Sequence, residues 1–314
     1  HCGSSADGFI LKGIMAVFLP LIIKIFGVKA SIVITLHSRL DGPYLFFGAG
    51  FLRRLAILPL FLFSNAIIVT NKFDAREFSR WLPFLKDRVN YIAGGTGHYL
   101  AGDNLKEDAL KLRNQIKEND KEIILSNFGF MVPHKGIEEL LEAMSILKNR
   151  GHLVRLLAIG AFDTDFGLAG SYFNELQKKA KALNLESYIK WTGFCGPEDT
   201  SLWLLASDIC VMPFRDGASE WRSSFLDALS HGLPIITTYS AKTPDDFVNK
   251  VNCMLIPPKD SFRLADAIEE LVSLPGLRKS MGIAAQVFYR KEYDWPVIAR
   301  KTKNLYANQV KRYG

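Results

Sequence analysis

The segment from Glu122 to Ile159 reads EIILSNFGFMVPHKGIEELLEAMSILKNRGHLVRLLAI and sets the pattern of the whole chain. Two short apolar runs in it, Glu122–Phe128 and Val154–Ile159, are typical of buried strands. Between them, Lys135–Arg150 places its apolar residues at helical spacing, and Gly151 follows as a stop signal. Strand, helix and strand in this order predict a βαβ crossover in a parallel sheet.

The same alternation of short apolar runs and helical patterns continues in both directions from this segment. The remaining strand candidates are Ser31–Leu36, Ala66–Thr70, Val89–Ile92, Ile189–Thr192, Asp208–Met212, Pro234–Thr238 and Cys253–Ile256. Runs that are apolar throughout, rather than alternating, suit strands covered by helices on both faces. The sequence therefore predicts an α/β fold of doubly wound parallel sheets.

The domain organisation follows from length and from one charged stretch. A chain of 314 residues is long enough for about two domains. The stretch Asp103–Lys121 is charged and poor in apolar residues, which predicts a helix and a linker with a boundary near Asn119. We expect an incomplete first domain over 1–118, because few strand candidates precede the boundary, and a complete doubly wound domain over 119–294.

Composition excludes several classes of protein. Hydrophobic residues make up 48% and charged residues 23%, as in globular proteins rather than disordered chains. The four cysteines show no metal-ligand spacing, so we interpret them as reduced, cytosolic thiols. No uncharged run is long and uninterrupted enough to predict a membrane-spanning helix. No basic stripe interleaved with aromatic residues is present, so nucleic acid is not an expected partner.

The positive charge is concentrated near the start. The chain carries a net charge of +7, and residues 1–100 hold 11 basic against 5 acidic side chains. A basic and apolar segment fits an anionic membrane surface or an acidic ligand, whereas an ordinary solvated face is the alternative.

Two turns after predicted strands carry the candidate chemistry. Ligands of open parallel sheets bind beyond the carboxyl ends of the strands. Lys135 stands at or near the first turn of the helix that follows Gly129–Gly136, and Arg222, Ser223 and Ser224 begin a second helix after Pro213. These cations and the N–H groups of both helix starts would together form a cradle for a diphosphate. Alternatively, each cation extends into solvent or pairs with a neighbour such as Glu139 or Asp216.

Other acidic residues give weaker signals. Asp227 lies five residues after Arg222, where its carboxylate is able to accept hydrogen bonds from the hydroxyls of a ribose or simply face solvent. Asp163 and Asp165 form an Asp-x-Asp pattern that suits a metal ion, although a solvated acidic loop is the favoured interpretation.

The order of these motifs resembles the family-four glycosyltransferases, of the glycosyl transferases group 1 type and GT-B architecture. The family pattern Gly-Arg-x(4)-Lys-Gly is similar to the stretch from Gly129 to Gly136, and Glu-Gly-Phe-Gly-x(4)-Glu is similar to the stretch from Ser219 to Asp227. Further similar stretches are Ile34–His37, Trp191–Phe194 and Asp294-Trp295. The resemblance implies two Rossmann-like domains facing a cleft, with 295–314 as a helix that crosses back to the first domain.

The resemblance also implies a function. A sugar would pass from a nucleotide sugar, linked to UDP or GDP, to a glycan or lipid-linked acceptor, with retention of configuration and with no metal or other cofactor. The enzyme would be cytoplasmic, with a peripheral location at the inner membrane face as an option. His37 and Glu220 would act at the donor sugar as catalytic residues. The donor would be bound by Gly129, Lys135, Phe194, Ser219, Arg222, Ser223, Ser224 and Asp227.

Two positions depart from the family pattern. The usual Arg is Phe130, for which Arg222 or Arg215 would substitute, and the first Glu is Ser219, for which Glu220 or Asp216 would substitute. These departures leave two alternatives to a metal-free transferase: a non-catalytic protein that binds nucleotide sugars, and a metal-dependent transferase acting through the Asp163 pattern.

Overall fold

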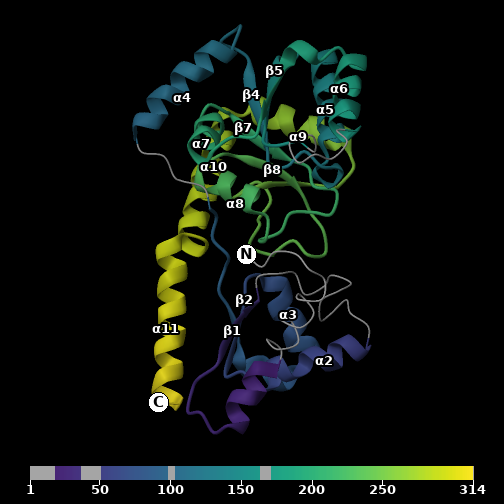
Figure 1. Ribbon diagram of the computed structural model, residues 1–314. Coiled ribbons are helices and arrows are strands. Elements are labelled where there is room, and N and C mark those ends of the chain that lie inside the picture. Colours follow the sequence, from purple (N-terminus) through teal and green to yellow (C-terminus); the bar gives the residue numbers. More distant parts are fainter. Residues whose placement is uncertain (1–17, 37–50, 98–102, 163–170, 314) are drawn as a thin grey trace. The chain divides into compact units, whose positions relative to one another are not determined.

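The computed structural model describes residues 18–36, 51–97, 103–162 and 171–313 of the chain. The chain divides into two compact units. Unit 1 comprises His1–Gly94 and Trp295–Gly314, and unit 2 comprises Gly95–Asp294. Each unit contains a parallel sheet flanked by helices (Figure 1), so the predicted α/β fold class is confirmed.

Unit 1 is built on a three-stranded sheet in the order β1-β2-β3. Its strands and helices are β1 (Val33–Leu36), α2 (Phe51–Leu62), β2 (Ala66–Val69), α3 (Lys72–Trp81), η1 (Pro83–Arg88), β3 (Val89–Tyr91) and α11 (Trp295–Tyr313), preceded by a helical segment at 18–25. Successive residues of β2 point to opposite faces. Ile67 therefore packs with Phe61 and Phe78 of α2 and α3, whereas Ile68 packs with Ile298 of α11.

Unit 2 is built on a six-stranded parallel sheet in the order β6-β5-β4-β7-β8-β9. Its strands are β4 (Ile123–Phe128), β5 (Val154–Ile159), β6 (Ile189–Gly193), β7 (Ile209–Met212), β8 (Ile235–Thr238) and β9 (Met254–Ile256). The central strands β4, β7 and β8 are buried along their whole length, as strands covered on both faces must be.

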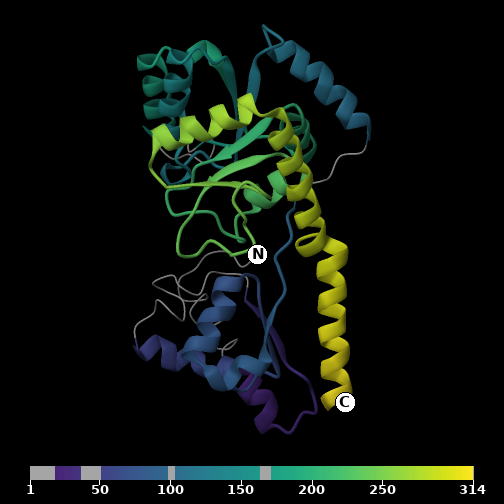
Figure 2. The same ribbon diagram turned by 180° about the vertical axis from the view of Figure 1, so that it is seen from behind.

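Helices cover both faces of this second sheet, as the opposite views of Figures 1 and 2 show. They are α4 (Asp103–Ile116), η2 (Pro133–Lys135), α5 (Ile137–Asn149), α6 (Ser171–Ala182), η4 (Glu186–Tyr188), α7 (Pro197–Leu205), α8 (Ser223–Ser230), α9 (Ser261–Ser273) and α10 (Pro275–Glu292). Helix α5 packs on α9 and α6, α8 packs on α10, and α4 packs on α7. The largest core cluster lies between the sheet and α5, α6 and α9.

All nine predicted strands are present, each within one or two residues of its predicted ends. The compact units divide between Gly94 and Gly95 rather than near Asn119, because α4 packs against α7 within unit 2. The compact units are defined by contacts within the structure, and the domain limits 1–118, 119–294 and 295–314 stay a prediction. Among the described residues, no helix is long and apolar enough to cross a membrane.

Candidate functional site

The two cationic turns follow neighbouring strands at the centre of the sheet in unit 2. Strand β4 pairs with β5 on one side and with β7 on the other, so the chain leaves the sheet in opposite directions after β4 and after β7. Open α/β sheets bind ligands at such a switch point, beyond the carboxyl ends of the strands. The topology therefore brings the turn that contains Lys135 beside the turn that ends at Arg222.

Glycines shape the first turn. Gly129 has a φ of +121° and donates its N–H to the Ile159 carbonyl at 2.9 Å, which holds the turn against the end of β5. Gly136 has a φ of +71°, and a methyl group on it would collide with the Pro213 carbonyl of the second turn. A larger side chain at either position is strained by its φ alone. The close approach at Gly136 keeps the two turns in contact.

Lys135 lies near the start of α5, as expected, but just before the helix rather than in its first turn. It ends the short helix η2, and Gly136 in the left-handed region separates it from the start of α5 at Ile137. The Lys135 side chain extends instead to α8, where its ammonium donates to the Ser224 hydroxyl at 3.0 Å. The cation thus lies at the start of the second helix, opposite the turn from which it comes.

The Lys135 ammonium is buried without a compensating carboxylate. Its residue is only 8% exposed, and no carboxylate in the described part of the chain forms an ion pair with it. Burial, followed by the nearby Arg222 guanidinium, lowers the pKa of Lys135 from 10.5 to about 8. Since a buried cation without an anionic partner is costly, the ligand-free site carries unneutralised positive charge.

Arg222 contributes a second cation beside the first. It is the residue that precedes α8, and its guanidinium lies 4.0 Å from the centroid of the Phe214 ring, whereas the Lys135 ammonium lies 5.0 Å from the same centroid. Arg222 forms an ion pair with Asp216, so the alternative of pairing with a neighbour is correct for this residue. The pKa of His134 is also lowered, mainly by burial and next by the charge of the nearby Arg222 guanidinium.

Arg215, the other candidate for the missing family arginine, is engaged elsewhere. Its guanidinium donates to both carboxylate oxygens of Glu139, at 2.8 and 3.2 Å, and pairs with Glu138 at 3.2 Å. Glu139 is thus occupied by Arg215 rather than by Lys135. Of the two arginines in the second turn, Arg222 is the one beside Lys135.

A cavity of about 240 Å³ opens at the start of α8. It is lined by Phe128, Gly129, Phe130, Lys135, Gly160, Ala161, Phe194, Cys195, Thr200, Ser223 and Ser224. A Cβ on Gly129 would lie 2.6 Å from the Lys135 ammonium, so the glycine leaves room beside the cation. Phe130 and Phe194 are both more than half exposed and flank the cavity with apolar surface.

The structure brings together five of the ten predicted site residues in this cavity: Gly129, Lys135, Phe194, Ser223 and Ser224. Arg222 adjoins them through Phe214. His37 lies outside the described residues, as do Asp163 and Asp165.

Three predicted residues are buried and do not line the cavity. The Ser219 hydroxyl is buried and makes no hydrogen bond in the described structure. Glu220 is 2% exposed and accepts a hydrogen bond from the Tyr293 hydroxyl at 3.1 Å. Asp227 is fully buried, and its carboxylate accepts a hydrogen bond from the Thr96 hydroxyl. The two carboxylates are thereby fixed in position by hydroxyl donors.

Sequence reasoning missed several residues that shape the site. Gly160 and Ala161 follow β5 and Cys195 follows β6, so the rule that ligands bind beyond carboxyl ends would have pointed to them. Thr200 lies on α7 and carried no such signal. Phe214 is next to Arg215 in the sequence, but the cations that it contacts are Lys135 and Arg222, and these contacts depend on tertiary structure.

The arrangement is suited to binding an anion. The first N–H groups of a helix lack intrahelical partners and point at any ligand placed before it. At α8 these groups adjoin the buried Lys135 ammonium in the cavity, and the Arg222 guanidinium lies over the Phe214 ring that this ammonium also contacts. Among the described residues, no group of three or more His, Cys, Asp or Glu is placed to hold a metal ion.

Comparison with proteins of known structure bears on the fold. The Anabaena protein HepE, solved in complex with UDP, superimposes with a TM-score of 0.71 at 18% identity, over 93% of this chain and 76% of that one. A sucrose-phosphate synthase from Thermosynechococcus elongatus gives a TM-score of 0.69 at 20% identity, over 89% and 68%. At this level of identity the likeness shows the fold, which is that of the GT-B glycosyltransferases.

Comparison with curated sequences bears on the family. An uncharacterized glycosyltransferase of Methanocaldococcus jannaschii is 23% identical over 80% of this chain and 62% of its own length. The chain thus spans about half to three fifths of the first relatives that it matches. Residues 108–288, more than half of the chain, match the family described as Glycosyl transferases group 1. Together with the GT-B fold, this match shows that the chain belongs to the group 1 glycosyl transferases.

Proposed function

We propose that this chain is a glycosyltransferase that moves a sugar from a UDP- or GDP-linked donor to a glycan or lipid-linked acceptor. Membership of the group 1 family supports a transfer reaction. A Mycobacterium tuberculosis relative, 23% identical over 61% of this chain and 48% of its own length, is named a GDP-mannose-dependent phosphatidylinositol monomannoside mannosyltransferase. That name supports a nucleotide-sugar donor and a lipid-linked acceptor for this chain as well.

The buried Lys135 ammonium is the observation that carries the proposal. Its positive charge and the start of α8 meet at one small cavity, and the Arg222 guanidinium lies over the Phe214 ring that the Lys135 ammonium also contacts. A diphosphate in this cavity would give the Lys135 ammonium the anionic partner that it lacks. It would also accept hydrogen bonds from the backbone N–H groups of Ser223 and Ser224. We place the donor diphosphate there.

The same charges support the chemical step. When the bond between the anomeric carbon and the diphosphate oxygen breaks, the electron pair stays on the leaving diphosphate, and an acceptor hydroxyl forms the new bond and loses its proton. Lys135 and the start of α8 would stabilise the negative charge that develops on the leaving group. A metal-free reaction, retention of configuration, and a role for His37 and Glu220 at the sugar rest on the family resemblance.

Asp227 is proposed to hold the donor ribose. Its carboxylate lies in the same helix as Ser223 and Ser224, and Thr96 donates a hydrogen bond to one of its oxygens. A carboxylate fixed in this way is a suitable acceptor for vicinal hydroxyls. The ribose would then lie beside the helix whose start binds the diphosphate.

A second candidate function is non-catalytic binding of nucleotide sugars. Ser219 stands where the family has a glutamate, and its buried hydroxyl makes no hydrogen bond among the described residues, so Ser219 itself supplies no carboxylate to the donor sugar. Phe130 likewise stands where the family has an arginine and points no charge at the cavity. Binding would survive these changes more readily than catalysis.

A two-stage experiment separates these functions. A thermal-shift panel of UDP, GDP and their sugars identifies the donor, because a ligand that binds only the folded state raises the melting temperature. Release of nucleoside diphosphate in the presence of candidate acceptors then measures turnover. Binding with turnover supports the transferase, binding without turnover on any acceptor supports the binder, and no binding of any nucleotide contradicts both.

A further inference from the structure

Charge is divided unequally between the two compact units. Unit 1 holds 16 Lys and Arg against 5 Asp and Glu, a net charge of +11. Unit 2 holds 23 against 27, a net charge of −4, although it contains the cationic cavity. An excess of this size in one unit exceeds what solubility requires and indicates an anionic partner for unit 1.

Part of unit 1 combines this charge with exposed apolar surface. Residues 18–30 form the helical segment 18–25 and the turn and irregular stretch that follow it. Five large apolar side chains in these thirteen residues are between 43% and 78% exposed: Leu19, Ile22, Ile25, Phe26 and Val28. We call this set the apolar face. Proteins in water rarely leave so many large apolar side chains exposed in one short stretch unless the surface binds something.

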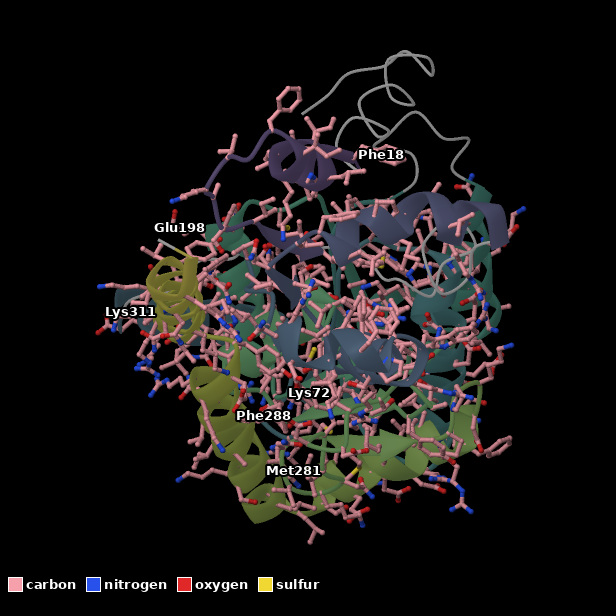
Figure 3. All side chains as sticks on the ribbon, turned by 90° about the horizontal axis from the view of Figure 1, so that it is seen from below. Phe18, Lys72, Glu198, Met281, Phe288 and Lys311 are labelled. Carbon is pink, nitrogen blue, oxygen red and sulfur yellow. The ribbon has the colours of Figure 1, made fainter. Side chains whose placement is uncertain are left out.

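The apolar face has a helical arrangement and protrudes from unit 1. Leu19 and Ile22 lie three residues apart in the helical segment, which places them on the same side of it, and Phe26 follows in the next turn, where its N–H donates to the Ile22 carbonyl at 3.1 Å. In Figure 3 the side chains of this purple segment, beside the label Phe18, extend outward from the ribbon. They are therefore able to enter a surface together.

All charged residues of the segment 18–30 have the same sign. Lys24 and Lys29 lie within it, and neither forms an ion pair with a carboxylate of the described residues. The sequence contains no Asp or Glu between Asp7 and Asp41, and none between Asp41 and Asp74. Helix α11 of the same unit also carries five basic residues and no acidic one.

We propose that residues 18–30 dock unit 1 on the surface of an anionic lipid bilayer. The apolar face would enter the boundary between headgroups and acyl chains, while Lys24 and Lys29 contact lipid phosphates. Charge complementarity selects this occupant over a second copy of the chain, since two copies meeting through this face would bring like charges together. The proposal does not depend on the donor site in unit 2.

Vesicle flotation tests the proposal on the whole chain. Vesicles of phosphatidylcholine alone are compared with vesicles containing three parts in ten phosphatidylglycerol, at 50 and 500 mM NaCl. We expect binding to the anionic vesicles at low salt, and weak binding to neutral vesicles or at high salt, because salt screens the lysine contacts.

Two double variants separate the apolar and ionic contributions. Ile25→Ser with Phe26→Ser should lower the partition coefficient at least tenfold, since each side chain loses about the transfer free energy of one buried apolar residue. Lys24→Gln with Lys29→Gln should lower it about 25-fold, from roughly fivefold per lysine. Matched controls in unit 2 are Phe262→Ser, which removes an exposed aromatic residue, and Lys178→Gln with Lys181→Gln.

Any of three outcomes overturns the proposal. The first is equal binding of the wild-type chain to neutral and anionic vesicles, or to neither. The second is an equal loss of binding in the unit 2 controls and the unit 1 variants. Sedimentation of the wild type and of each variant without vesicles detects self-association. The third outcome is a wild-type dimer that dissociates when Ile25 and Phe26 are changed, which would assign the apolar face to a second copy of the chain. Unchanged thermal unfolding of the variants shows that they are folded.

Discussion

Replacing Lys135 by methionine should raise the stability of the ligand-free protein while weakening its binding of a nucleoside diphosphate. Methionine is close to lysine in length and keeps an apolar contact with Phe214, but it carries no charge. In the ligand-free protein the ammonium is buried with no ion-pair partner among the described carboxylates, so its removal relieves an unfavourable interaction. In the complex the same ammonium is expected to face the diphosphate, so its removal is costly there.

The magnitude follows from the pKa of Lys135. The fall from 10.5 to about 8 means that burial destabilises the charged form by about 3 kcal/mol, at ~1.4 kcal/mol per pKa unit. Loss of the hydrogen bond to Ser224 offsets about 1 kcal/mol of that gain. We therefore expect the variant to be more stable than the wild type by about 2 kcal/mol at pH 7.

The difference should depend on pH in a defined direction. Below pH 8 the lysine is protonated in both the folded and the unfolded state, and the full destabilisation is present. Between about pH 8 and 10.5 the unfolded state binds a proton that the folded state does not, so wild-type stability rises with pH. The advantage of the methionine variant should shrink across that interval.

Urea unfolding of both proteins at pH 7 and at pH 9.5 measures these differences without any ligand. A higher midpoint for the variant at pH 7, and a smaller difference at pH 9.5, are the expected results. A variant less stable than the wild type at pH 7, or a difference that grows with pH, would refute the description of Lys135 as an uncompensated buried cation.

Two further predictions concern the turns and the thiols. Gly136→Ala should destabilise unit 2 by about 1–3 kcal/mol in thermal or urea unfolding, because its φ is +71° and the new methyl would meet the Pro213 carbonyl; an unchanged midpoint would mean that the two turns are not in contact. Burial raises the pKa of both Cys210 and Cys253 to about 12, so iodoacetamide at pH 8 should label Cys195 before either of them, as peptide mass spectrometry would show; faster labelling of Cys210 would contradict its burial.

The sequence was sufficient for the strands and for the position of the site in the fold. The segment Glu122–Ile159 predicted β4, α5 and β5 because its apolar residues change from a continuous run to helical spacing and back. The rule on carboxyl ends then placed Lys135 and Arg222 near one another, and their two turns do adjoin. These features depend on local patterns and on the handedness of parallel crossovers, which sequence reveals well.

The contacts of the individual charges could not be predicted. The sequence offered Glu139 and Asp216 as partners for either cation; Arg222 does pair with Asp216, but Glu139 is engaged by Arg215 and Lys135 has neither carboxylate. Gly136 in the left-handed region separates Lys135 from α5, and the close approach of the Pro213 carbonyl to Gly136 joins turns that are distant in sequence. Contacts between residues distant in sequence, such as the one between Asp227 and Thr96, leave no periodic signal.

The most direct test of the donor site compares two lysine variants by calorimetric titration with UDP and with GDP. Lys135→Ala removes the buried ammonium, and Lys178→Ala removes an exposed lysine of the same unit. For the nucleotide that the wild type binds, we predict a loss of about 1.5–3 kcal/mol, or 10- to 150-fold in affinity, for the first variant. The second variant should bind as the wild type does. Equal affinity in both variants would contradict a diphosphate site at Lys135.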